Sequence, residues 1–166
     1  MIGSRESELR APDFVEPVIG FRAWRLRDGE IVSPYVDTPW TAGPMKARCL
    51  RERVHFRPAA APHEEPAPVP HCGCGIYAYF HPVDRAGGDP QFVRGAVVMW
   101  GRIEVHSEGM RAEYAQAVIF VEPADWRRRR ELHHAAERVG VEVVPPADLR
   151  RAAARHGREL PKGLLG

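Results

Sequence analysis

The sequence predicts an α+β fold with a mostly antiparallel, curled or barrel-like β-sheet and a C-terminal αβα tail. Three observations support this prediction. Short segments of alternating polarity are joined by turn residues, five prolines fall between residues 58 and 70, and helical periodicity begins after residue 122. Because short antiparallel strands leave unpaired edges, we expect the sheet to curl and to close or cover those edges.

A chain of 166 residues suits one compact domain, because a chain of this length buries about 70% of its unfolded surface. The first residues are polar, so we expect a flexible N-terminal arm over 1–16. We expect a β-rich core over 17–122 and a helical tail over 123–166 that packs on this core.

Short strands make up the first half of the predicted core. Residues 19–26 alternate apolar and polar side chains, and an Asp-Gly turn signal precedes a short return strand at 31–32. Residues 45–50 form a further predicted strand, which carries Cys49. The stretch 58–70 excludes a helix and a central strand, because each proline removes a backbone donor and fixes φ.

Longer strands follow, and then helices. We predict strands at 75–80, 93–106 and 111–121, the last two joined by a Ser-Glu-Gly turn. The predicted tail consists of three elements: a helix over 125–138 with Asp125 as N-cap and Gly140 as its end, a short strand at 141–144, and a second helix from Pro145 to about His156.

Charge and hydropathy exclude some classes of protein. The formal net charge of +2 does not by itself indicate a polyanionic partner. The N-terminus lacks the apolar segment of a signal peptide, and no stretch approaches the ~20 apolar residues of a membrane span. We therefore expect a cytoplasmic protein with no membrane partner.

All three cysteines lie within one stretch, at Cys49, Cys72 and Cys74, together with three of the eight histidines. An odd number of cysteines fits metal ligands or reduced thiols better than a secreted disulfide framework. Zinc prefers four nitrogen or sulfur ligands, and a histidine would supply the fourth. His63 is the preferred candidate, because it would tether the proline-rich loop; His71 is the second, because adjacent residues rarely converge on one ion.

Cys72 and Cys74 share one ion only if the backbone bends, since residues i and i+2 of a regular strand lie roughly 6.8 Å apart. Gly73 and Gly75 permit such a bend. We therefore predict a structural Zn²⁺ held by Cys49, His63, Cys72 and Cys74, which makes residues 17–122 a metal-binding core with a zinc-tethered loop.

Four alternatives to the zinc site remain open at this point. Three buried, reduced cysteines can act as small core residues, and an iron–sulfur cluster can use the same ligands. Cysteine redox chemistry is a third alternative. The His63-Glu64-Glu65 segment and the Cys-x-Cys pair loosely echo a zinc deaminase signature, but the cysteines are one residue too close.

Two further sets of residues carry functional side chains. The first lies on the predicted hairpin 97–117 and can form an acid–base or anion-binding face, although cross-strand ion pairs on a solvated face are the more usual explanation of such a set. Its candidate catalytic residues are Arg102, Glu104, His106, Arg111 and Glu113. The second is the basic run Arg127, Arg128, Arg129 and Arg130, which acidic residues surround, as on the wet side of an amphipathic helix.

The amino-acid sequences of several segments resemble those of a known group of proteins. Residues 72–78 (CGCGIYA), the later W-G-R-I at 100–103 and R-A-E-Y-A at 111–115 resemble small, uncharacterised bacterial proteins common in actinobacteria. The resemblance covers residues 19–117. It implies a shared fold and adds no activity, and Met110 stands where a bulky aromatic is more usual.

These observations lead to three hypotheses about function. The first is a zinc-stabilised, β-rich binding module for a protein or small ligand, without catalysis. The second is an enzyme that uses the Arg102–Glu113 face, with the metal still structural. The third is nucleic-acid binding through the sheet and the arginine-rich helix, which is the least favoured because the net charge is small.

Overall fold

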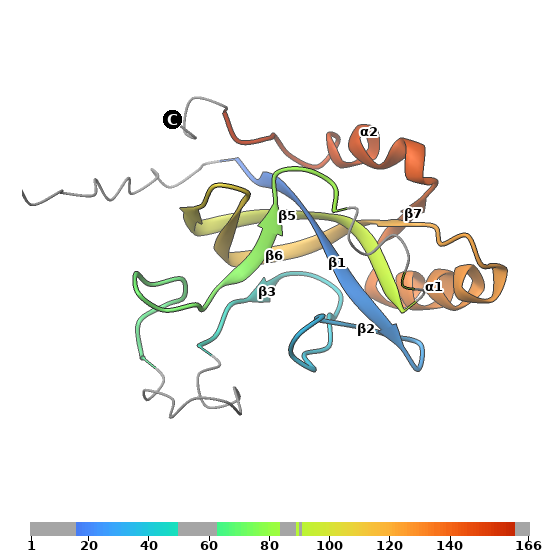
Figure 1. The fold of residues 1–166 in the computed structure, drawn as a ribbon, viewed down its shortest axis with the longest axis horizontal. Coiled ribbons are helices and arrows are strands. Elements are labelled where there is room, and N and C mark those ends of the chain that lie inside the picture. Colours follow the sequence, from blue (N-terminus) through green and yellow to red (C-terminus); the bar gives the residue numbers. More distant parts are fainter. Residues whose placement is uncertain (1–15, 50–62, 84–88, 90, 162–166) are drawn as a thin grey trace, which may run out of the picture.

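The computed structural model describes residues 16–49, 63–83, 89 and 91–161 (Figure 1). Seven strands of the described residues form one sheet. The elements are β1 (Val18–Arg27), β2 (Glu30–Val32), β3 (Met45–Lys46), β4 (Ile76–Tyr79), β5 (Phe92–Val105), β6 (Gly109–Val121), α1 (Trp126–Val139), β7 (Glu142–Val144), the 3₁₀ turn η2 (Pro146–Asp148) and α2 (Leu149–Ala153). Helix α1 lies between β6 and β7 in the chain, and α2 follows β7. The fold is thus α+β and mostly antiparallel, as the sequence predicts.

Strand β6 is the central strand of the sheet and pairs with four others. One edge pairs antiparallel with β5 along most of its length. The opposite edge carries three short strands in a row: β7 at 119–121, β3 at 114–115 and β4 at 109–112. This arrangement explains a correction to the predicted strand 45–50. Strand β3 ends at Lys46 because β4 occupies the next part of the same edge, so Cys49 lies beyond the strand; Leu50 lies outside the described residues.

The sheet curls but does not close into a barrel. Strand β5 lies between β1 and β6 and pairs with both. Strand β4 also lies between β1 and β6, but it pairs with β6 over four residues and with β1 only at Phe21↔Tyr79. Gly20 permits this approach of β4 to β1, since a Cβ on Gly20 would lie 2.5 Å from the Cβ of Ala78. The absence of a side chain at position 20 therefore helps set the curl of the sheet.

Replacing Gly20 by alanine should destabilise the protein by about 1–3 kcal/mol, because an added methyl in a packed interior forces neighbouring groups apart. Chemical denaturation measures this change in the free energy of unfolding. The double variant Gly20→Ala, Ala78→Gly removes the methyl group in conflict and should recover part of the loss. Equal stability of the single and double variants would contradict this account.

The C-terminal segment packs on both faces of the sheet. Helix α1 begins at the N-cap Asp125, whose carboxylate accepts a hydrogen bond from the Arg128 N–H at 2.9 Å, and ends at Gly140 with φ 70°. The chain then returns as β7, which pairs parallel with β6. In Figure 1, α1 and α2 lie at different sides of the strands.

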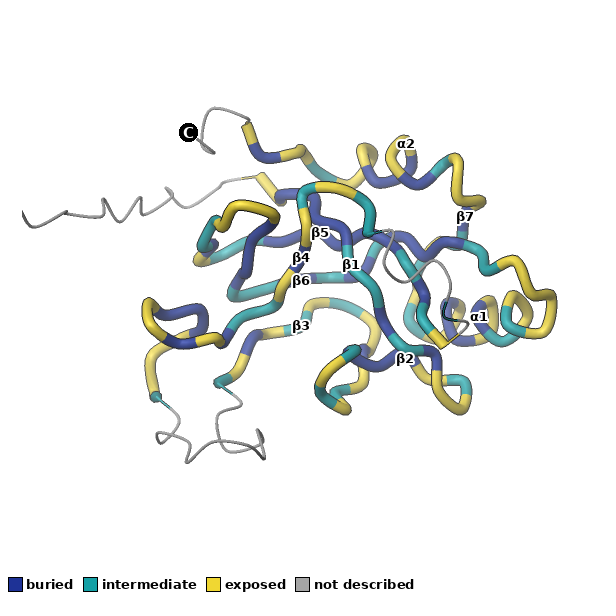
Figure 2. Tube along the Cα trace, in the orientation of Figure 1, coloured by how far each residue is buried: buried dark blue, intermediate teal, exposed yellow. Residues whose placement is uncertain are grey.

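Alternate residues of the strands face the two helices, as the period-2 pattern requires. On one face, α1 contributes Leu132, Ala135 and Ala136 to a core that contains Trp24 and Phe120. On the other face, α2 contributes to a smaller core with alternate strand residues; its members include Phe21, Ala96, Ile119, Leu149, Ala152 and Ala153. Figure 2 shows the buried segments running along the long strands.

Two other predictions differ from the structure or fall outside it. The second helix is shorter than the predicted 145–156: η2 leads into α2, which ends at Ala153. The chain must then turn, because Arg158 forms a parallel bridge with Val18 at the start of β1. The arm predicted over 1–16 lies outside the described residues except for Glu16. Among the described helices, none is long and apolar enough to cross a bilayer.

Candidate metal centre

Cys49, His63, Cys72 and Cys74 come from three places in the chain. Cys49 follows β3, His63 lies in the described part of the proline-rich loop, and the cysteine pair immediately precedes β4. Cys72 and Cys74 are buried, with 5% and 8% exposure, whereas Cys49 is half-buried. Their side chains form a small cluster of their own, separate from the two sheet cores, together with Ala47, Ala67, Val69 and Ile76.

Three of the predicted ligands meet within ligand distance. One donor atom each from Cys49, His63 and Cys72 lies within 4.8 Å of the others. The Sγ atoms of Cys49 and Cys72 are 3.8 Å apart. Two Zn–S bonds of about 2.3 Å at a tetrahedral angle place their sulfurs about 3.8 Å apart, so this spacing matches one edge of a zinc site.

Cys74 joins the cluster through His63. The Nε2 atom of His63 lies 3.2 Å from Cys74 Sγ, somewhat closer than the ~3.5 Å of a nitrogen and a sulfur on one tetrahedral ion. The other ring nitrogen, Nδ1, lies 2.8 Å from the carbonyl oxygen of Glu65. A carbonyl only accepts, so Nδ1 carries the proton and Nε2 presents its lone pair to the sulfurs. This orientation is typical of a metal-binding histidine.

The backbone bends around the cysteine pair at His71 and Gly75. Cys72 N–H donates to Val69 O at 3.3 Å, and His71 has φ 64°, the left-handed value required at the third position of a type II turn. Gly75 has φ 123°. Gly75 thus has the positive φ expected of a glycine in this bend, whereas Gly73 does not adopt one. His71 is exposed and lies outside the ligand set.

Two glycine variants test whether the positive φ at Gly75, rather than a position near the cysteines alone, is needed for metal binding. Gly75→Ala should weaken metal binding and cost about 1–3 kcal/mol of stability, because alanine disfavours this φ and its Cβ would lie 3.0 Å from Arg111 Cβ. Gly73→Ala is the matched control, since its Cβ would meet only Tyr77 Oη at 3.9 Å. Thermal melting and metal content compare the two. Equal losses in both variants would contradict the assignment of the bend to Gly75.

The surroundings of Cys72 and Cys74 shift the pKa values of their thiols in opposite directions. Burial alone raises the pKa of Cys72, but the Cys74 backbone N–H and the side chains of Cys74, His63 and Cys49 outweigh it and lower the pKa to about 6. Burial raises the pKa of Cys74, and the neighbouring Cys72 and Cys49 raise it further despite a backbone hydrogen bond from Val69. Cys72 therefore ionises more readily than Cys74, and the thiolate is the form that binds a metal.

Arg111 of β6 holds the backbone around the cysteine pair. Its guanidinium donates to the carbonyl oxygens of Val69 at 3.2 Å, Cys74 at 2.9 Å and Cys72. It also forms a 2.5 Å ion pair with Glu104 of β5. Although burial alone would lower the pKa of Arg111, the hydrogen bond and charge of Glu104 raise it. Arg111 is only 4% exposed and remains a cation that fixes the loop on the sheet.

The other members of the candidate catalytic set lie on the same side of the β5–β6 hairpin. Arg102 donates to the carbonyl oxygens of Pro66 at 3.0 Å and Pro68 at 3.4 Å. His106 Nε2 lies 3.5 Å from Glu104, and a Glu113 carboxylate oxygen lies 3.4 Å from the Arg102 N–H. These residues lie near one another, but two of the cations, Arg102 and Arg111, contact backbone carbonyls of the loop. No pattern in the sequence indicates this role.

The arginine run lies on α1, as predicted. Arg128 pairs with Glu131 at 2.8 Å and Arg129 approaches Glu122 at 4.0 Å. The guanidinium groups of Arg127 and Arg130 stack on the ring of Trp126, 5.4 and 5.3 Å from its centroid. Trp126 is 59% exposed, so this end of the helix presents an aromatic ring and two cations to solvent.

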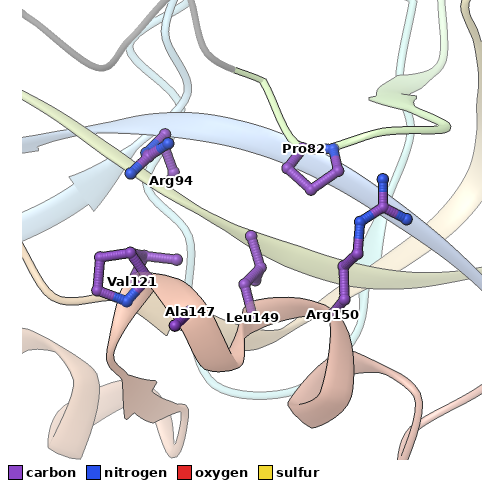
Figure 3. A pocket seen from close by; sticks show the side chains of 7 residues that line it. Pro82, Arg94, Val121, Ala147, Leu149 and Arg150 are labelled. Carbon is purple, nitrogen blue, oxygen red and sulfur yellow. The ribbon is translucent and has the colours of Figure 1, made fainter.

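Two shallow cavities lie away from the cysteine cluster. The first, of about 240 Å³, lies between α2 and β5; Figure 3 shows Arg94 and Arg150 on opposite sides of Leu149. The second, of about 230 Å³, lies beside Trp40 and α1. Both are smaller than the roughly 300–1,000 Å³ typical of small-molecule sites. Neither is lined by Arg111 or Glu113, the residues expected around an active site on the hairpin.

Comparison with protein-family models, with curated proteins and with solved structures finds no match to this chain.

Proposed function

We propose that the protein is a zinc-stabilised binding module in which Cys49, His63, Cys72 and Cys74 hold one structural Zn²⁺. The observation that carries the proposal is the convergence of sulfur and imidazole donors, with Cys49 Sγ 3.8 Å from Cys72 Sγ and His63 Nε2 3.2 Å from Cys74 Sγ. Four nitrogen and sulfur donors are the usual ligand set of structural zinc. On binding, Cys74 would draw closer to the other donors.

The energetics favour an occupied site over three packed thiols. Bringing Cys49 and Cys72 together closes a loop of 23 residues, which costs only a few kcal/mol of chain entropy. Structural zinc contributes roughly 10–16 kcal/mol in small peptides near neutral pH. A cluster of reduced thiols alone supplies no comparable term, since a thiol is only a weak hydrogen-bond donor to His63 Nε2.

A closed coordination shell supports a structural ion over a catalytic one. Catalytic zinc keeps one position open for water or substrate, whereas the proposed set would fill all four positions with protein atoms. The arginines of the alternative enzyme face are engaged with loop carbonyls, which favours a role in positioning the loop. The proposed activity is therefore binding of a protein or small ligand, with the metal and Arg111 fixing the loop on the sheet.

Two histidine variants test the ligand assignment. His63→Ala should lower the zinc content from one ion per chain to a small fraction of that value, because it removes the only nitrogen donor. His71→Asn should keep full zinc content, since His71 is exposed and asparagine tolerates its left-handed φ. Elemental mass spectrometry of protein purified without added metal gives the stoichiometry. Loss of zinc in His71→Asn with full retention in His63→Ala would reverse the assignment, and iron in the wild type would indicate a cluster.

A second candidate function is nucleic-acid binding at the start of α1. The exposed Trp126 between Arg127 and Arg130 favours it, because an aromatic ring with cations can stack on a base and contact phosphates. A gel shift with mixed RNA and DNA at low salt tests this candidate, with Trp126→Ala as the variant. A shift that weakens with salt and with the substitution supports it, and no shift at low salt eliminates it.

A further inference from the structure

We propose that Cys49 is an oxidation site for hydroperoxides, and that its oxidation produces a Cys49–Cys72 disulfide that expels the zinc ion. This inference rests on the proposed zinc site and assigns it a form of regulation. Three observations carry it: the spacing of the sulfurs, the difference in their exposure and the position of the pair in the chain.

The spacing favours one disulfide over the others. Cys49 Sγ and Cys72 Sγ are 3.8 Å apart, so a movement of about 1.8 Å brings them to the S–S bond length of about 2.05 Å. Cys72 and Cys74 are separated by one residue, and a disulfide between them would close a small, strained ring. The bend at His71 and Gly75 is held by Arg111, which keeps this pair from rearranging.

Exposure indicates which sulfur reacts first. Cys49 is half-buried, whereas Cys72 and Cys74 are 5% and 8% exposed. A small oxidant therefore reaches the Cys49 sulfur without opening the cluster. Susceptibility to oxidation follows access, and Cys49 is the most accessible of the three sulfurs.

The reaction balances with a hydroperoxide as the oxidant. The Cys49 thiolate attacks the peroxide oxygen, forming an S–O bond and breaking the O–O bond, and the leaving oxygen takes up a proton. The Cys72 thiolate then attacks the Cys49 sulfur, forming the S–S bond and releasing hydroxide, which a second proton converts to water. Two thiolates are oxidised by two electrons in total and one peroxide is reduced.

The oxidised protein keeps Cys49 linked to Cys72 but loses the zinc ion. A disulfide joins the same two points of the chain that zinc joined, so Cys49 stays beside β4. Only His63 and Cys74 remain as ligands, which is too few to retain zinc. Oxidation thereby frees the His63 side of the proline-rich loop, and reduction with zinc present restores it.

Hydrogen peroxide added to the full-length, reduced, zinc-loaded protein tests the proposal. A chromogenic chelator measures released zinc, and intact mass with fragmentation of linked peptides identifies the disulfide. The expected result is one zinc released per Cys49–Cys72 disulfide, with the loss of two hydrogen atoms and reversal by a thiol reductant plus zinc. Retained zinc, sulfinic acid at Cys49 without a disulfide, or a Cys72–Cys74 disulfide would each overturn the inference.

The same design separates this inference from the proposed function. If the purified protein binds no zinc, the proposed function fails. The disulfide itself is then still measurable by mass on the reduced chain. If zinc is present but peroxide gives none of the expected linkage, only the redox inference fails.

Discussion

Replacing Cys72 by serine is expected to abolish zinc binding and to leave the protein unfolded or prone to aggregate at room temperature. A hydroxyl is a poor zinc ligand. Cys72 is also the buried thiol that contacts Cys49 and accepts a hydrogen bond from the backbone N–H of Cys74. A domain has a net stability of about 5–15 kcal/mol, and structural zinc supplies an amount of the same order. Circular dichroism melting curves and zinc content measure the effect, and Cys74→Ser should behave in the same way.

Ala47→Ser is the matched control for the cysteine variants. Ala47 lies in the same small cluster as Cys72 and is 8% exposed, so this substitution introduces a similar hydroxyl without removing a ligand. We expect Ala47→Ser to keep zinc and to melt within a few degrees of the wild type. A wild-type melting temperature in Cys72→Ser would contradict a structural ion.

Replacing Arg111 by methionine is expected to destabilise the protein by about 3–5 kcal/mol and to weaken zinc binding. The change removes hydrogen bonds to three carbonyl oxygens, of Val69, Cys72 and Cys74. Val69 O keeps the Cys72 N–H, whereas a buried carbonyl oxygen that loses its partner costs about 1–3 kcal/mol. The change also leaves Glu104 without its cation. Chemical denaturation gives the stability, and competition with a chromogenic chelator gives the zinc affinity.

Two controls separate the hydrogen bonds of Arg111 from its charge. Arg111→Lys keeps the charge but lacks the planar fork, so it should recover only part of the stability. Arg102→Met removes two bonds to the same loop from an exposed arginine and should cost about 1 kcal/mol or less. A loss in Arg102→Met as large as in Arg111→Met would show that Arg111 has no special role.

Local patterns in the sequence predict much of the fold. The alternation before Arg27 and the Asp28-Gly29 turn correspond to the β1–β2 hairpin, in which both turn residues have positive φ. Asp125 and Gly140 mark α1 because capping depends on neighbouring residues. The pairing of strands that are distant in the chain cannot be predicted from such local patterns. The end of β3 at Lys46 depends on β4, some thirty residues later, occupying the edge of β6.

The sequence predicts three members of the cysteine–histidine cluster but not its surroundings. Cys49, His63 and Cys72 lie within ligand distance of one another, as their clustering in the sequence indicates. The contacts of Arg111 with loop carbonyls are not encoded by spacing. A charged residue on a strand most often faces solvent, and only the tertiary position of the loop turns this one into a buried hydrogen-bond donor.

The most direct test of the account is zinc X-ray absorption spectroscopy on protein purified without added metal. The account predicts one zinc per chain in a four-coordinate shell, with three sulfurs at about 2.3 Å and one imidazole nitrogen at about 2.0–2.1 Å. A chain that carries no metal, or a zinc shell made mainly of oxygen and nitrogen, would contradict the claim that Cys49, His63, Cys72 and Cys74 hold a structural ion.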